Sequence, residues 1–281
     1  MKTSNKLLIA LAVSLIIIPI IVIAINVKVN YKNEKAFYKN LKENTELKSA
    51  LDGYTSKELP QFSTVSLSDG NDAYINFVVI KSDKPGIKIP TDLMEIYDVK
   101  VDNNGILQFV LKNADKKLKY SLTAYIYSNN VKAFDIAKAA GFTLDIKTDS
   151  VNINAKDVNR LNFADSTSIK LLSIKADKVG DLRFDNAKNG IVNVELNNSN
   201  FSTLKSPFQS LSINSTGQSN IEIFGDNREK TMYKIDELSI KTAGKTELNI
   251  DDIRVLKSSG NLSDSTKVNA SASIIKSMFN K

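Results

Sequence analysis

The stretch that decides the fold is LSIKTAGKTELNI, residues 238–250. It holds two triplets, LSI and LNI, in which apolar residues flank a polar one, and the triplets begin ten positions apart. Related units are LSINSTGQSNIEI at 211–223 and LSIKADKVGDLRF at 172–184. Side chains alternate between the two faces of a strand, so each triplet places its two apolar residues on one face. The unit therefore predicts two short strands, each with one buried face.

The triplet recurs over the C-terminal half of the chain at a nearly constant spacing. Successive triplets begin 9 to 11 residues apart, apart from one longer interval that contains NREKTMYKIDE at 227–237. The first residues of the eleven triplets are Phe142, Val151, Leu161, Leu172, Leu182, Val192, Phe201, Leu211, Ile221, Leu238 and Leu248. A fixed period of this kind is the signature of a repeat architecture.

Outside the long interval, the segments between triplets hold at most eight residues, which is too few for a crossover helix. They are rich in Asn, Ser, Asp, Lys and Gly, which favour turns. We therefore predict an all-β fold, a right-handed parallel β-helix or β-solenoid whose stacked coils bury a continuous apolar interior. Two strands per coil give a coil of roughly twenty residues, and three strands per coil stay open. A β-sandwich is the alternative, since strands at this spacing also suit one.

An opening β segment precedes the repeat. Apolar runs with turn clusters between them extend from Leu59 to Leu111, and Leu118 to Tyr127 adds a further strand. The tyrosines of this last strand could form a platform for stacking sugars, although alternating aromatics more often cover a sheet face. We assign residues 57–256 to the β-solenoid domain and 257–281 to a polar C-terminal cap or tail.

The N-terminal segment predicts a membrane anchor. Residues 7–27 carry no charge over 21 positions, which suffices to cross a hydrocarbon core of about 30 Å. They follow a short tail, 1–6, and precede a juxtamembrane stalk or helix, 28–56. A cleaved signal peptide is the alternative. The lysines after residue 27 outnumber those before residue 7, which favours a cytoplasmic C-terminal side, whereas the β-rich body favours the periplasm or the outside, and we adopt the outward orientation.

Composition removes most enzyme classes from consideration. The chain has no cysteine and no histidine, so it has no disulfides, thiolate nucleophiles, imidazole bases or usual zinc and haem ligands. Its net charge of +7 comes mainly from lysine, which argues against specific nucleic-acid recognition. The remaining candidates for acid–base chemistry are turn carboxylates, namely Asp145, Asp149, Asp157, Asp165, Asp177, Asp181, Asp185, Asp251 and Asp252.

Several motifs resemble a known bacterial family. They are LPQFSTVSLSDG (59–70), YINFVVI (74–80), VKVDNNGILQFVLKN (99–113) and YSLTAYIYSNNVKAFDIAKAAGFTLDI (120–146), followed by the LSI and LNI units. Over roughly 57–255 the chain is similar to the auto-transporter adhesin head (GIN) domain, a domain of unknown function. The resemblance implies a β-helical, envelope-located, adhesin-like protein and supplies no catalytic or binding residues. The Lys- and Asn-rich turns depart from the family's small Ser-Gly-Ala turns.

The sequence therefore predicts a non-catalytic, single-pass membrane protein whose β domain binds or scaffolds a glycan or an envelope protein, with no cofactor, no metal and no assigned site residue. Two alternatives stay open. One is a carbohydrate-active enzyme on the same fold, a polysaccharide lyase or hydrolase, and the other is an envelope sensor or regulatory partner. Ligand, oligomeric state and biological process are not specified by the sequence.

Overall fold

The computed structural model describes residues 3–30, 46–116, 121–186, 188–226, 228 and 233–279. The chain divides into two compact units, Met1–Ser49 and Ala50–Lys281. In the first unit, helix α1 (Thr3–Asn30) contains Pro19. Among the residues that the structure describes, no helix has the length and apolarity needed to cross a membrane. Most of the predicted stalk, residues 31–45, lies outside the described residues.

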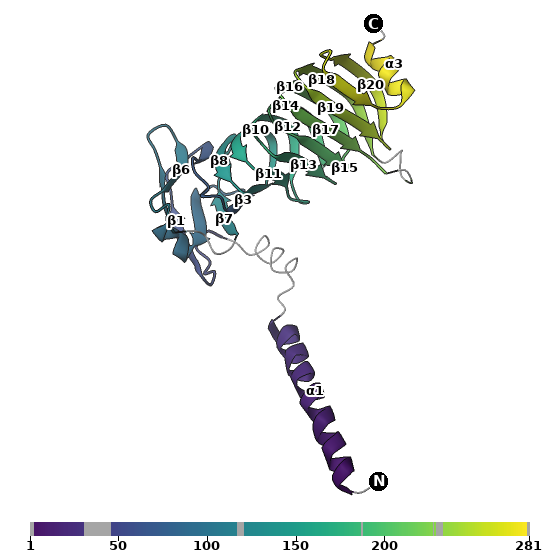
Figure 1. Cartoon of the computed structure of the whole chain (residues 1–281). Coiled ribbons are helices and arrows are strands. Elements are labelled where there is room, and N and C mark those ends of the chain that lie inside the picture. Colours follow the sequence, from purple (N-terminus) through teal and green to yellow (C-terminus); the bar gives the residue numbers. More distant parts are fainter. Residues whose placement is uncertain are drawn as a thin grey trace. The chain divides into compact units, whose positions relative to one another are not determined.

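The second unit is built from two large sheets, labelled in Figure 1. Sheet A has the order β1 (Tyr54–Glu58), β4 (Gly86–Pro90), β7 (Leu122–Tyr127), β3 (Tyr74–Ile80), β9 (Gly141–Asp145), β11 (Arg160–Phe163), β13 (Asp181–Asp185), β15 (Phe201–Leu204), β17 (Ser219–Phe224), β19 (Thr246–Asp251) and β21 (Thr266–Asn269). Sheet B has the order β20 (Arg254–Asn261), β18 (Lys234–Ala243), β16 (Phe208–Thr216), β14 (Lys188–Asn197), β12 (Ser168–Asp177), β10 (Lys147–Val158), β8 (Ala133–Ala139), β2 (Thr64–Leu67), β6 (Ile106–Leu111) and β5 (Tyr97–Val101). The only described helices of this unit are the short η1 (Thr91–Glu95) and α3 (Ala272–Phe279), so the all-β prediction is confirmed.

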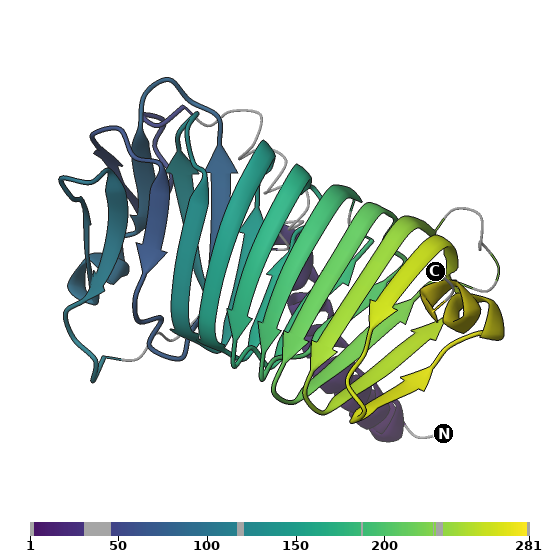
Figure 2. The same ribbon diagram turned by 90° about the horizontal axis from the view of Figure 1, so that it is seen from above.

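From β8 onward the chain alternates between the two sheets, and each repeat gives one strand to each sheet. Leu161 pairs in parallel with Phe142, nineteen residues earlier, and with Leu182, twenty-one residues later. Ile221 pairs with Leu248, twenty-seven residues later, because the segment containing 227–232 lengthens that repeat. Figure 2 shows the resulting rows of parallel strands.

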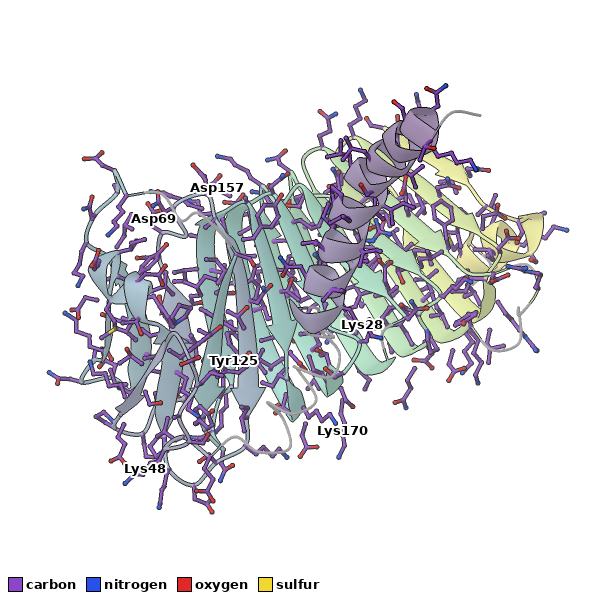
Figure 3. The ribbon with its side chains drawn as sticks, turned by 90° about the horizontal axis from the view of Figure 1, so that it is seen from below. Lys28, Lys48, Asp69, Tyr125, Asp157 and Lys170 are labelled. Carbon is purple, nitrogen blue, oxygen red and sulfur yellow. The ribbon has the colours of Figure 1, made fainter. Side chains whose placement is uncertain are left out.

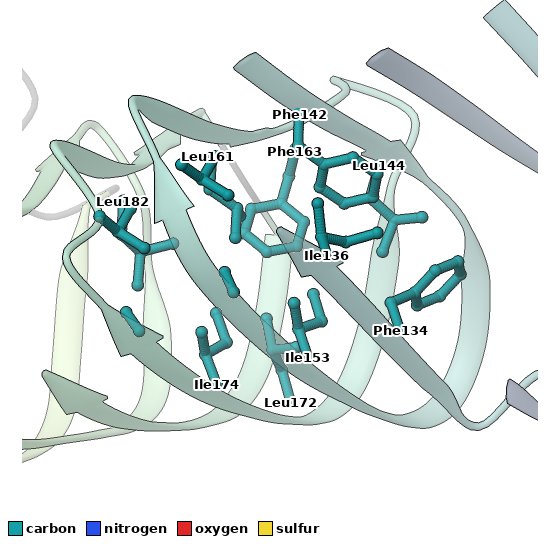
Figure 4. Close-up of a cluster of buried hydrophobic side chains, with 14 of the residues drawn as sticks. Phe134, Ile136, Phe142, Leu144, Ile153, Leu161, Phe163, Leu172, Ile174 and Leu182 are labelled. Atoms are coloured by element: carbon teal, nitrogen blue, oxygen red, sulfur yellow. The ribbon is translucent and has the colours of Figure 1, made fainter. Parts of the chain in front are cut away.

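The core lies between the sheets and is made of the triplets. The first residue of each of the eleven triplets is buried, and Figure 4 shows Ile153, Leu172 and Ile174 of sheet B beside Leu161 and Leu182 of sheet A. One triplet departs from the apolar pattern, because Thr203 occupies its third position and its buried hydroxyl makes no hydrogen bond within the described structure. Period-two alternation thus predicts which side chains form the core.

Residues at the corners between the sheets have positive φ values, in the left-handed region of backbone conformation. At the ends of successive sheet-B strands, φ is positive at Lys138, Asp157, Lys178, Asn198 and Gly217, with values between 47° and 75°. This conformation is unfavourable for residues that have a Cβ and costs roughly 1–2 kcal/mol each. The stacking of neighbouring repeats therefore holds four non-glycine corners in a shape that they would not adopt alone.

The two ends of the stack differ from its middle. At the N-terminal end β1 pairs with β4, β4 with β7, and β5 with β6, all antiparallel, whereas the repeats pair in parallel. At the other end α3 packs on β20 and buries Ile274 and Met278 against the core. The predicted cap or tail, residues 257–281, therefore contains the end of β20, all of β21 and α3 in its described part, 257–279.

Candidate functional site

The second unit has a groove on the outer side of sheet B, with a volume of about 560 Å³. It crosses the carboxyl-terminal parts of six neighbouring strands, from β2 through β8, β10, β12 and β14 to β16. Strands in a sheet lie about 4.8 Å apart, so five intervals give a length of about 24 Å. We call this feature the sheet-B groove. Its dimensions suit an extended chain better than a compact small molecule.

Strand register sets the order of side chains along the groove. In-register pairing aligns Asp135, Asn154, Lys175, Glu195 and Asn214, one from each of five adjacent strands. All five line the groove. They share one sheet face because each stands one position beyond a buried residue of its strand. The row therefore presents carboxylates, amides and a lysine in fixed sequence.

Hydrogen bonds between the side chains pre-order the groove. Asn154 Nδ2 donates to Asp135 Oδ1 at 2.6 Å, and Asn197 Nδ2 donates to Asp177 Oδ1 at 2.7 Å. Lys175 Nζ lies 3.5 Å from Glu195 Oε2, with both side chains more than 60% exposed. Because Asn154, Asn197 and Lys175 each contact an acidic partner, both signs of charge face a ligand in a fixed pattern.

The groove chemistry suits recognition by hydrogen bonds and charge. None of the residues that line it is aromatic. Within the described residues, no three or more Asp or Glu side chains gather in an arrangement that could hold a metal ion. The arrangement therefore offers polar complementarity rather than ring stacking or metal chemistry.

The predicted carboxylates are spread over the molecule. Asp177 lines the sheet-B groove, whereas Asp165 and Asp185 line a second hollow on sheet A, where Arg183 Nε donates to Asp185 Oδ2 at 2.6 Å. Asp181 accepts a hydrogen bond from Ser202 Oγ at 2.7 Å. Because Asp177 lines a hollow on sheet B whereas Asp165 and Asp185 line one on sheet A, the structure does not gather the nine candidates into one site.

The remaining candidates serve turns and surface ion pairs. Asp149 lies 2.7 Å from Lys170 Nζ, whose hydrogen bond lowers the pKa of Asp149. Asp157 occupies a left-handed corner, and Figure 3 shows Asp157 and Lys170 at opposite margins of the strand stack. The other three are Asp145, which accepts from Ser166 Oγ, Asp251, which accepts from the Asp252 backbone N–H, and Asp252, which has a φ of 55°.

One aspect of the site was not recovered from the sequence. The row from Asp135 to Asn214 depends on register, and repeat lengths of 19 to 21 residues hide it from a fixed count. For Leu118–Tyr127 the sequence favours tyrosines that cover a sheet face over a sugar platform, and Tyr125 and Tyr127 are both buried. Tyr120 lies outside the described residues.

Comparisons with known proteins identify a matching family and similar solved structures. A family model described as "Putative auto-transporter adhesin, head GIN domain" matches residues 61–231. Among solved structures, the chain is similar to a putative adhesin from Parabacteroides merdae, at 14% identity over 76% of this chain and 91% of that chain with a TM-score of 0.35. It is also similar to a putative lipid binding protein from Parabacteroides distasonis, at 14% identity over 77% and 96% with a TM-score of 0.39. No curated protein matches the chain.

Proposed function

Because the chain belongs to the family described as putative auto-transporter adhesin, head GIN domain, we propose that it is a non-catalytic, adhesin-like binding protein of the bacterial cell envelope. Its β domain acts as the binding module, and the sheet-B groove is the face that holds the partner. The observation that carries this proposal is the row of carboxylate, amide and lysine side chains from Asp135 to Asn214, which spans four strand spacings, or about 19 Å.

The proposal includes a membrane anchor and a solenoid architecture. The uncharged residues 7–27 support a single N-terminal span, with the β domain facing the periplasm or the outside. Parallel pairing between consecutive repeats, at offsets near twenty residues, supports a right-handed β-solenoid rather than a β-sandwich. In such a solenoid the groove runs along the stacking direction, so its length grows with the number of repeats.

The groove chemistry favours a protein partner. Charges of both signs, Lys156 and Lys175 against Asp135, Asp177 and Glu195, line it without any aromatic ring. Complementary charges steer and orient protein segments, whereas sugar rings are commonly held against aromatic faces. We therefore assign the groove to an extended, mixed-charge segment of an envelope protein.

Site-specific photocrosslinking in intact cells tests the groove. A photoreactive residue at position 214, in the groove, is expected to give a protein adduct of defined mass, whereas one at position 267, on β21 of sheet A, gives none. Lys175→Glu is expected to lower the adduct yield about tenfold by placing like charges together, and adding Glu195→Lys is expected to restore part of it. Equal adducts at both positions, or only glycan adducts at 214, would contradict the assignment.

Protease treatment of spheroplasts tests the orientation separately. The β domain of the full chain is expected to be digested from outside without lysis, because the outward orientation leaves it unprotected. A cytoplasmic control protein must stay intact in the same sample. Protection of the β domain until lysis would overturn the outward orientation without bearing on the groove.

A further inference from the structure

Sheet A carries a second hollow, on the outer surface of the sheet that does not form the groove. It has a volume of about 410 Å³, and its lining includes Thr143, Arg160, Asn162, Asp165, Arg183 and Asp185. The chain has only four arginines, and two of them stand here. A planar guanidinium offers donors in a fixed fork, which suits bidentate contacts to a ligand.

An exposed aromatic ring lies beside this hollow. Tyr74, the first residue of β3, pairs with Gly141 of β9, and its side chain is 58% exposed. The Cδ1–Cε1 side of the ring occupies the space that a Cβ at position 141 would need. Gly141 thus lets the Tyr74 ring lie close over the neighbouring strand. Tyr125 and Tyr127 of the adjacent β7 are buried, so they offer no such face.

Register places Tyr74 in line with Arg160. Leu161 of β11 pairs with Phe142, so Arg160 stands next to Gly141 in the row that begins at Tyr74. Two strand intervals separate Tyr74 from Arg160, or about 10 Å between their backbones. The Tyr74 ring therefore covers Gly141, and Arg160 is the next residue of the same row.

The polar groups of the hollow are fixed and only partly satisfied. Arg183 Nε donates to Asp185 Oδ2 at 2.6 Å, which fixes the guanidinium and raises the pKa of Arg183. The second oxygen, Asp185 Oδ1, is buried and makes no hydrogen bond within the described structure. A buried acceptor without a donor is unfavourable.

The lining of the hollow carries two charges of each sign. Arg160 and Arg183 accompany Asp165 and Asp185, and Asp181 and Glu222 also lie close enough to Arg183 to raise its pKa. An anion would meet these carboxylates, and a cation would meet the two guanidinium groups. A neutral ligand with many hydroxyls avoids both penalties, because it donates to the carboxylates and accepts from the arginines.

We propose that the Tyr74–Arg160 surface is a binding site for a neutral sugar ring. The apolar face of the ring stacks on Tyr74 above Gly141, while its hydroxyls hydrogen-bond to Arg160 and Asn162. An amphipathic aromatic beside a few fixed polar groups is the combination that holds and orients such a ligand. The site goes beyond the proposed function, because it lies on the other sheet and takes a different class of ligand.

Saturation-transfer NMR titrations of the full chain test this site, in a zwitterionic detergent without a sugar headgroup. The probes are cellotriose, maltotriose and chitotriose. At least one is expected to bind, with the strongest transfer to its ring C–H protons. Tyr74→Ala is expected to weaken binding about five- to tenfold, Tyr74→Phe to retain it within about twofold, and Arg160→Ala to weaken it about fivefold.

Two controls separate this site from the groove. Lys175→Ser, in the sheet-B groove, is expected to leave sugar affinity unchanged, and circular dichroism must show that each variant keeps its β structure. Failure of all three sugars to bind, or equal affinity of Tyr74→Ala and the wild type, would overturn the sugar site. Neither result bears on the photocrosslinking at position 214, so the two proposals fail separately.

Discussion

Lys88 is a basic residue in a fully buried position. It lies on β4 with no exposed surface, opposite Ser56 and Tyr125, and its Nζ is 5.6 Å from the centre of the Tyr127 ring. Burial lowers the pKa of its ammonium group, because removal from water disfavours the charged form. The ring face recovers part of that cost through a cation–π contact. The charged form of Lys88 is therefore less favourable in the folded chain than in the unfolded chain.

Replacement of Lys88 by methionine is expected to raise the free energy of unfolding by about 1 kcal/mol at pH 7, since an apolar side chain of similar length removes the buried charge. The pKa of Lys88 is lower in the folded chain than its ordinary 10.5. Between those two pKa values the unfolded chain binds more protons, so wild-type stability rises with pH. The advantage of Lys88→Met should therefore shrink as pH rises from 7 toward 10.

Urea unfolding at pH 7, 8 and 9.5 measures the difference in unfolding free energy between Lys88→Met and the wild type. Burial raises the pKa of Tyr97 to about 12, so the folded chain loses stability above pH 10 as the unfolded tyrosine ionises. Keeping below pH 10, and comparing each variant with wild type at the same pH, removes that contribution. A Lys88→Met advantage that stays constant or grows with pH would contradict the assignment of a buried ammonium.

The strands repeat along the stack, but equivalent corners between strands hold different residue types. Gly217 and Lys178 end equivalent sheet-B strands with φ values of 75° and 54°. A Cβ at position 217 would collide with the side chain of Asn198, while Lys178 already has its Cβ accommodated. The same backbone shape thus tolerates a side chain at one corner and excludes it at the other.

Gly217→Ala is expected to lower the free energy of unfolding by about 2 kcal/mol, from the left-handed strain together with the collision. Lys178→Gly is its matched control and is expected to stay within about 0.5 kcal/mol of wild type, because relief of strain offsets the greater freedom of the unfolded chain. Urea midpoints measure both changes. Equal losses in the two variants would show that the Asn198 contact is unimportant.

The elements show where sequence reasoning succeeds and where it stops. Leu238 and Ile240 were predicted as core because period-two alternation is local, and both are buried. The row that contains Lys175 and Glu195 is not local, since it depends on the number of residues in every corner. Strand β7 buries both Tyr125 and Ile126, so the rule that alternate residues share one exposed face fails there. The alignment of Tyr74 with Arg160 in one row also depends on the register of three strands.

At the scale of the whole β domain, the end strands of a parallel sheet can pair with other copies of the protein. The last strand of a regular stack exposes backbone groups and core side chains that match those of another copy. Here the first strands turn antiparallel, and at the other end α3 covers β20 with Ile274 and Met278. Ser277 Oγ also accepts a hydrogen bond from the Ser258 backbone N–H at 3.2 Å, which fixes the helix to the strand.

Met278→Asp is therefore expected to detach α3 and convert the protein to concentration-dependent oligomers, because a charge cannot stay buried against the core and the exposed end then pairs with other copies. Lys276→Asp is the matched control, since Lys276 is an exposed residue of the same helix and its substitution leaves the packed face intact. Sedimentation velocity at a series of protein concentrations measures the outcome. A Met278→Asp variant that keeps the wild-type sedimentation profile at every concentration would show that α3 does not limit association, and the protection would then belong to the strand edges themselves.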